Sequence, residues 1–184
     1  MLGGRKTVSV PTDYLSGLFW YFFQQCDKMN ETIRQLEFGD VIMVRKATVN
    51  DAEQLGVLND EFNGTGETTF DNIRNSLMYN QQEVVVVDDE NGVLTGFVCV
   101  QLKKSFCYDE YMPEITEVYV RPAYRERGIA SQMISFAEDY CSKNYPLHKY
   151  ELLTGTENII AQSLYAKLGY TDDSELHLSK RIKK

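Results

Sequence analysis

Residues 83–104 form the pattern EVVVVDDENGVLTGFVCVQLKK, in which two runs rich in β-branched residues flank Asn91 and Gly92. Asn-Gly adopts the positive φ angles of tight hairpin turns, and β-branched runs favour extended backbone. The pattern therefore predicts two long antiparallel strands. The rest of the domain must then bury the apolar side chains of an antiparallel sheet.

The rest of the chain supplies further strands and helices around this hairpin. Thr48 is the expected N-cap of a helix, with Asp51 placed for a capping box, and Gly169 is the expected C′ residue of another. Strands are predicted at 41–47, 114–120, 149–154 and 175–182, and helices at 48–62, 69–79, 130–144 and 159–170. This order implies an α/β (α+β) fold with a mixed, mostly antiparallel central sheet flanked by helices.

The composition changes near Asp40. Residues 1–40 hold a crowded aromatic block without sustained helical or strand periodicity, whereas regular patterns begin at Val41. We therefore expect an N-terminal extension of uncertain structure at 1–40 and one folded domain at 41–184.

Charge and cysteine spacing exclude several classes of function. Lys and Arg number 19 against 27 Asp and Glu, a net charge of −8, which makes nucleic acid and anionic membranes poor partners. The longest apolar stretch, 18–23, is far too short to span a bilayer, and a signal-peptide cleavage site is lacking, so we expect a cytoplasmic protein. The four cysteines and two histidines lack metal-ligand spacing, so no metal is expected.

The turn RERGIAS, residues 125–131, joins a predicted strand to a predicted helix. Unpaired amides at a helix N-terminus carry the positive end of the helix dipole and bind phosphate oxygens. Gly128 allows close backbone approach, and Arg121, Arg125 and Arg127 concentrate positive charge in an acidic chain. A local anion site is one interpretation, and an ordinary strand-to-helix connection is the other.

The segment EVYVRPAYRERGIA, followed by Asn158 and SLYAKLGY, resembles the GNAT superfamily of N-acetyltransferases, whose signature is an R/Q-x-x-G-x-G/A turn after a V-x-P strand end. Here the matching residues are Arg125, Gly128 and Ala130, after Val120 and Pro122. The resemblance covers about Val41 to Lys180. It implies acetyl-CoA as the acetyl donor.

The same resemblance implies where the donor binds. Its pyrophosphate would lie on the turn and its pantetheine arm along the preceding strand, with Asn158 near the arm. The residues implied are Val118, Tyr119, Val120, Arg125, Glu126, Arg127, Gly128, Ile129, Ala130, Ser131 and Asn158. Asn158 is equally well placed to be the N-cap of the helix that follows it.

Two catalytic residues are implied. Tyr165 matches the family's proton donor for the leaving thiolate, with simple packing against the sheet as the alternative. Glu117 matches the acid that meets the substrate amine in polyamine and aminoglycoside acetyltransferases, with Glu114 second and a solvated strand charge as the alternative. Strand alternation predicts Glu117 and Tyr119 on one face and Glu114 on the other, unless a bulge intervenes.

The resulting hypothesis is an acetyl-CoA-dependent N-acetyltransferase for a primary amine of a small cationic molecule such as an aminoglycoside or polyamine. The alternatives are a protein or peptide amine as acceptor, and a non-catalytic acyl-CoA-binding module. The sequence leaves open whether the protein forms a homodimer.

Overall fold

The structure is a computed structural model that describes residues 42–182. The predicted extension at 1–40 lies outside the described residues. In the part that is described, five strands form one sheet in the order β1-β2-β3-β4-β5. The strands are β1 (Ile42–Lys46), β2 (Glu83–Glu90), β3 (Val93–Lys103), β4 (Met112–Val120) and β5 (Glu151–Leu152). The first three pairings are antiparallel, and β4 and β5 run parallel, which confirms the mixed, mostly antiparallel sheet.

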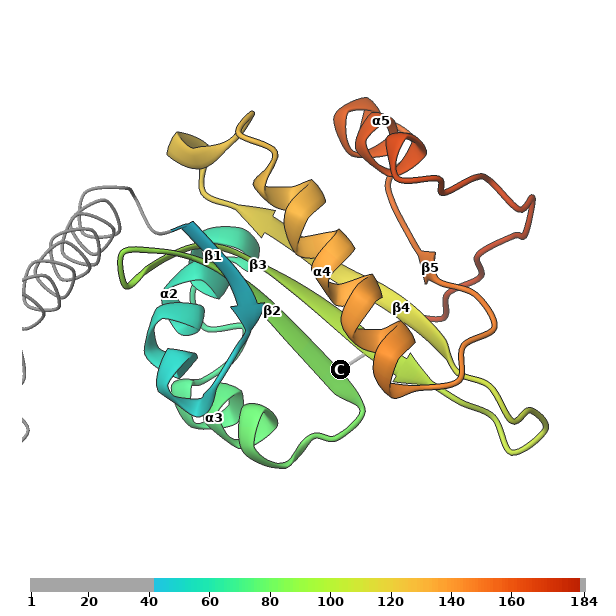
Figure 1. Ribbon diagram of the computed structural model, residues 1–184, viewed down its shortest axis with the longest axis horizontal. Helices are drawn as coiled ribbons and strands as arrows, with labels where there is room; N and C mark the ends of the chain where they lie inside the picture. The colour runs from blue at the N-terminus through green and yellow to red at the C-terminus, as the bar shows by residue number, and fades with distance from the viewer. Residues whose placement is uncertain (1–41, 183–184) are drawn as a thin grey trace, which may run out of the picture. The chain divides into compact units, whose positions relative to one another are not determined.

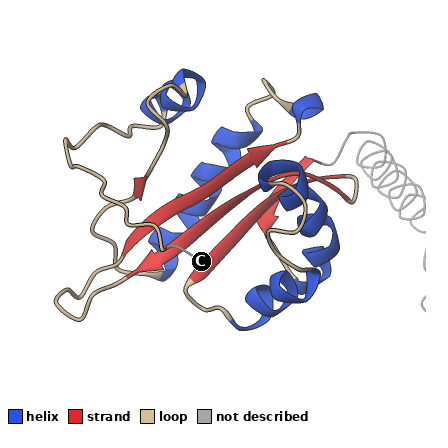
Figure 2. Cartoon of the chain, turned by 180° about the vertical axis from the view of Figure 1, so that it is seen from behind, coloured by secondary structure: helices blue, strands red, loops and turns tan. Residues whose placement is uncertain are grey.

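Helices cover both faces of this sheet, as Figures 1 and 2 show from opposite sides. α2 (Ala52–Asn63), which follows a short 3-10 helix (Val49–Asp51), and α3 (Phe70–Tyr79) lie on one face. α4 (Ile129–Asn144) lies on the other face, and α5 (Ile159–Lys167) follows β5. No helix within residues 42–182 has the length and apolar character needed to cross a bilayer.

The apolar run that opens β2 is explained by this two-sided cover. Val84 and Val86 belong to a core cluster with Met133 of α4, whereas Val85 and Val87 belong to a second cluster with Leu58 of α2. Successive strand residues point to opposite faces, so a strand buried on both faces needs an unbroken apolar run. The unbroken apolar run therefore fits the position of β2 between β1 and β3, with helices on both faces of the sheet.

Two expected strands differ in the structure. The strand predicted at 175–182 is absent: residues 171–182 have no regular secondary structure, and Leu176, Leu178 and Ile182 are exposed. Alternating apolar residues form a strand only where a neighbouring strand supplies hydrogen bonds, and none of the described strands pairs with this segment. The strand predicted at 149–154 is reduced to Glu151–Leu152, where it meets β4.

The close packing of β3, β4 and α4 requires a glycine at position 96 of β3. A Cβ at this position would lie 2.5 Å from the backbone oxygen of Tyr119 and 3.0 Å from Cε of Met133. Gly96 therefore permits β3, β4 and α4 to pack at their observed separation.

We expect Gly96→Ala to lower the free energy of unfolding by about 1–3 kcal/mol, because the new methyl group overpacks the core. Gly56→Ala is the matched control, since its Cβ would meet only Cδ1 of Ile73, at 3.7 Å, and alanine favours the helix by up to about 1 kcal/mol. Urea unfolding of the full chain measures both. Equal stability of the two variants would contradict this packing.

Candidate functional site

Strand β4 has one edge that is largely without a partner. It pairs with β3 along its length, but with β5 only at Glu114 and Ile115. The amide of Arg121 donates to the carbonyl of Thr95 on the β3 side, at 2.8 Å. Backbone groups alternate in direction along a strand, so those of Val118 and Val120 face the gap toward β5. This exposed edge offers hydrogen bonds to an extended ligand.

The turn after β4 presents unpaired amides. Glu126 and Gly128 both have left-handed backbone, with φ angles of 64° and 79°. The bond from Gln132 N to Gly128 O, at 3.1 Å, is the first of α4, so the amides of Ile129, Ala130 and Ser131 precede its hydrogen-bonded turns. Residues 125–128 are exposed. A concave turn with free N–H groups at the N-terminus of a 16-residue helix suits phosphate oxygens.

The arginines near this turn do not gather around it as expected. Arg121 forms an ion pair with Glu61 of α2 at 3.0 Å, and its hydrogen bonds hold the pKa of that carboxyl below its usual range. Arg127 forms an ion pair with Glu90 at 3.1 Å. Arg125 donates from Nε to the carbonyl of Val120 at 3.0 Å. Backbone amides, with Arg125 beside them, therefore make up most of the positive potential at the turn.

A bulge in β4 decides which acids share a face. Glu117 pairs with Cys99 and Ile115 pairs with Val100, so Thr116 is an extra residue between consecutive positions of β3. Ile115 joins the α4-side core, while Glu117 points to the α2 and α3 side.

The same register shift corrects the expectation for Glu114. Because Glu114 pairs with Gln101, two positions from Cys99, it lies on the same face as Glu117. Its carboxylate forms an ion pair with Lys103 at 3.1 Å, and Lys103 also contacts Glu151. Glu114 is thus neutralised at the rim of the sheet.

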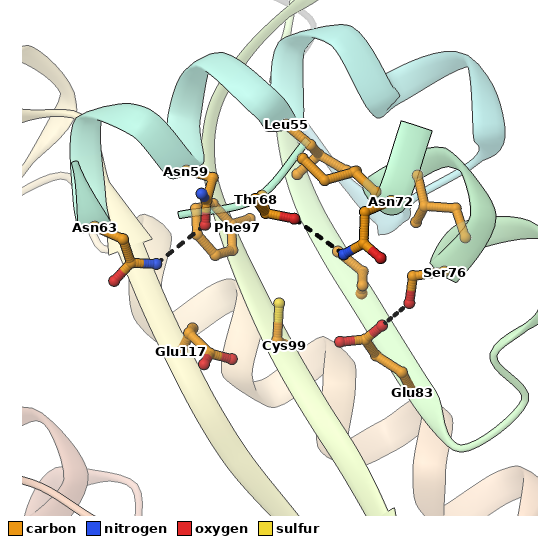
Figure 3. A pocket seen from close by; sticks show the side chains of 13 residues that line it. Leu55, Asn59, Asn63, Thr68, Asn72, Ser76, Glu83, Phe97, Cys99 and Glu117 are labelled. Carbon is orange, nitrogen blue, oxygen red and sulfur yellow. Dashed lines mark hydrogen bonds between the residues drawn. The ribbon is translucent and has the colours of Figure 1, made fainter. Parts of the chain in front are cut away.

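A cavity of about 230 Å³ lies between the sheet and helices α2 and α3. Figure 3 shows its lining side chains, with Glu117 and Glu83 on either side of Cys99. The polar lining residues are Asn59, Asn63, Thr68, Asn72, Ser76, Glu83 and Glu117, and the others are Leu55, Ile73, Leu77, Val85, Phe97 and Cys99. Among the described residues, no Lys or Arg lines this cavity.

Two groups in the cavity wall are unusual. Nδ2 of Asn59 is buried and has no hydrogen-bond partner among the described residues. The pKa of the Cys99 thiol is raised well above its ordinary value, first by burial and then by the negative charges of Glu117 and Glu83. Cys99 therefore stays a neutral thiol, and the cavity has a negative potential.

Tyr165 lies on the other side of the sheet from this cavity. It extends from α5 into the half-buried rim of the α4-side core, to which Val118 also belongs. Burial raises the pKa of its hydroxyl above the ordinary value, so the group is protonated at neutral pH. Its ring meets Tyr170 edge-on, with centroids 6.0 Å apart.

The remaining predicted donor-site residues have clear structural roles. Oδ1 of Asn158 accepts from the amide of Ala161 at 3.2 Å, which confirms its alternative role as the N-cap of α5. Tyr119 pairs with Phe97 on the β3 side, and its hydroxyl donates to Glu61 at 3.0 Å. Its own backbone therefore faces β3, unlike that of Val118 and Val120.

Sequence reasoning did not identify Glu83, Asn59 or the other polar residues of α2 and α3 that line the cavity. A signal exists for Glu83: an acid begins a strand that is otherwise buried on both faces, in alternation with Val85 and Val87. For the helical residues no signal is evident, since polar side chains on a surface helix ordinarily face water. Among residues 42–182, no cluster of three His, Cys, Asp or Glu side chains is suited to a metal ion.

The model of the acetyltransferase (GNAT) family matches residues 54–170, well over half of the chain. The chain belongs to this family. The match contains most of α2 and all of α3, the hairpin, β4, the turn at 125–128 and α5, which are the elements that form the site.

Individual relatives are distant. The chain is 28% identical over 95 residues to the uncharacterized N-acetyltransferase YhfO of Bacillus subtilis, and this covers 52% of the chain and 63% of that protein. An aminoglycoside acetyltransferase from an uncultured soil sample has a TM-score of 0.68 at 12% identity, over 77% of this chain and 97% of that one. A ribosomal-protein-alanine N-acetyltransferase from Brucella melitensis has a TM-score of 0.65 at 16% identity, over 77% and 99%. These structures share the fold and confirm the expected architecture.

Proposed function

We propose that the protein transfers an acetyl group from acetyl-CoA to a primary amine of a small cationic molecule. The observation that carries this proposal is the cavity beside β4, which holds two carboxylates and no Lys or Arg. A cationic amine would be attracted to it. Family membership supports the acetyl donor.

The described residues fit acetyl-CoA. The start of α4 supplies the amides of Ile129, Ala130 and Ser131 for the pyrophosphate, at the positive end of the helix. The edge of β4 at Val118, together with the amide of Val120, can bind the amides of the pantetheine arm as an added strand, while the Val120 carbonyl accepts from Arg125. These are the residues that would hold the donor, which supplies an acetyl thioester to the reaction.

The reaction requires three proton transfers among the reacting groups and one exchange of bonds. Glu117 binds the ammonium group and accepts a proton from it, directly or through water, to give the neutral amine. The amine nitrogen forms a bond to the acetyl carbon, and the carbon–sulfur bond breaks. The Val118 N–H, on the free edge of β4, would stabilise the negative oxygen of the tetrahedral intermediate. Tyr165 donates its hydroxyl proton to the leaving sulfur, which becomes the free thiol. The nitrogen of the intermediate then loses its second proton, which returns to the Tyr165 oxygen, and Glu117 releases the first proton to water, so that a neutral amide is formed.

The position of β4 explains how the two catalytic groups act together. Glu117 points into the cavity on one face, while Tyr165 joins the core rim on the other, where Val118 also lies. A donor lying in the gap between β4 and β5 would therefore have the acceptor on one side and the proton donor on the other.

With acetyl-CoA, we expect the purified full-length chain to release free thiol in the presence of a small amine, because the acidic cavity concentrates such cations. The measurement is thiol detection with a panel of linear polyamines, aminoglycosides and peptides, and the acetylated product is identified by mass spectrometry. Glu117→Gln should reduce turnover by about 10²-fold or more. Tight acetyl-CoA binding without turnover of any amine would show a non-catalytic binding module instead, and turnover of peptides alone would make the acceptor a peptide amine.

Gly128→Glu should weaken acetyl-CoA binding by about tenfold or more, since a carboxylate would repel phosphate and a side chain strains a left-handed residue. Titration calorimetry with acetyl-CoA measures the affinity. Gly66→Glu is the matched control: Gly66 also has a left-handed φ, of 89°, but lies between α2 and α3. Unchanged affinity in Gly128→Glu would place the pyrophosphate elsewhere.

Tyr165→Phe should lower kcat by about 10²-fold or more while leaving acetyl-CoA affinity nearly unchanged, because only the proton donor is lost. The raised pKa of Tyr165 keeps its hydroxyl protonated, so the ratio of wild-type to variant rates should stay constant from pH 6 to about 9. Steady-state kinetics across this range test it. A kcat equal to that of the wild type would leave Tyr165 a packing residue only.

A further inference from the structure

We propose that the acceptor is a linear aliphatic diamine, with its reacting amine at Glu117 and its second ammonium at Glu83. The second ammonium site rests on the proposed function, because Glu117 and the edge of β4 define the reacting end. Glu83 is the first residue of β2, and its carboxylate lines the same cavity as Glu117 (Figure 3).

The cavity holds two negative charges that the described residues leave uncompensated. Glu83 accepts hydrogen bonds from neutral groups, the hydroxyl of Ser76 and Nε2 of Gln101, the latter at 3.1 Å. Within residues 42–182, neither Glu83 nor Glu117 forms an ion pair, whereas nearby Glu114 is paired with Lys103. A monocation would neutralise one carboxylate and leave the other, and a dication would neutralise both.

An independent observation also indicates that a polar molecule completes this cavity. Nδ2 of Asn59 is buried in its wall without an acceptor among the described residues. A buried donor that lacks an acceptor is costly, and it becomes satisfied if a bound molecule or water supplies one. The lone pair of a neutral amine is such an acceptor.

Strand register sets the spacing of the two ammonium groups. Glu83 pairs with Gln101, and Glu117 pairs with Cys99, two residues away on β3. Strands lie about 4.8 Å apart and rise about 3.4 Å per residue, so the two Cα atoms on β2 and β4 are roughly 12 Å apart. Both side chains line one cavity and point toward Cys99 from either side (Figure 3), which brings their carboxylates toward each other. A diamine with nitrogens roughly 6–9 Å apart would bridge them.

Volume and lining favour a thin, partly apolar molecule. A cavity of about 230 Å³ holds roughly eight water-sized groups at about 30 Å³ each. This suits 1,5-diaminopentane, a chain of five carbons with a nitrogen at each end. Between the two carboxylates, Cys99, Val85 and Leu77 supply apolar surface for the methylene chain.

The test compares 1,5-diaminopentane with pentylamine, which has the same chain and one ammonium group. The wild type should have a kcat/KM about tenfold or more higher for the diamine. Glu83→Gln should abolish this preference by raising KM for the diamine far more than KM for pentylamine. Glu53→Gln is the control, because Glu53 is exposed on α2 and does not line the cavity, and it should retain the preference. Ser76→Ala, which removes the donor that orients Glu83, should give a smaller loss.

Each outcome decides a separate point. Equal kcat/KM for the two amines in the wild type, or a preference that survives in Glu83→Gln, would overturn the second ammonium site while the proposed function stands. A higher kcat/KM for an aminoglycoside than for the diamine would overturn the linear acceptor. No turnover with any amine would overturn the proposed function, and this acceptor with it. Urea midpoints for each variant and calorimetric binding of the diamine exclude misfolding as the cause of a loss.

Discussion

One extra residue in β4 determines which of its side chains pack in the core and which line the cavity. Thr116 has no counterpart on β3, so Ile115 packs toward α4 while Glu117 reaches the cavity under α2 and α3. Without the bulge, strict alternation would place these two residues on the same face, and one of them in the wrong environment. An isoleucine would then line the acidic cavity, or a carboxylate would enter the core. The bulge also lies where the pairing of β4 with β5 ends. Beyond it, this edge of β4 has no partner strand among the described residues.

An acidic chain that is expected to bind a polyanion must solve an electrostatic problem. Its net charge is −8, and two of the three arginines near the turn are held by carboxylates, Arg121 by Glu61 and Arg127 by Glu90. Free amides at the start of α4 supply positive potential without any formal charge. They act at close range and do not reduce the long-range negative field. The same molecule can therefore attract a cationic acceptor over a distance and hold phosphates by contact.

Local signals in the sequence predicted most of the fold. The Asn-Gly hairpin, the helical spacing of α4 and the glycine after α5 are properties of neighbouring residues, and the structure contains each of them. The phosphate-type turn was visible for the same reason. The strand at 175–182 failed because apolar alternation describes a strand's faces but not the presence of a partner at its edge. The prediction that Glu114 lies on the opposite face from Glu117 was wrong because a bulge depends on the register with β3, which is a tertiary property.

The cavity was hidden from the sequence by the same logic, since its wall combines β2, β3, β4 and two helices. No single segment carries its signature.

The acidic residues on this face of the sheet are unequally paired with cations. Lys103 lies at the rim and pairs with Glu114 and Glu151, so the sheet has a cation within reach of its acids. Glu83 and Glu117, on the same face, have only neutral partners among the described residues. Two like charges in one small cavity destabilise the folded chain, and folding alone gives no reason to keep them there. The proposed dication would give that reason, because it would turn a repulsion into two charge-assisted contacts.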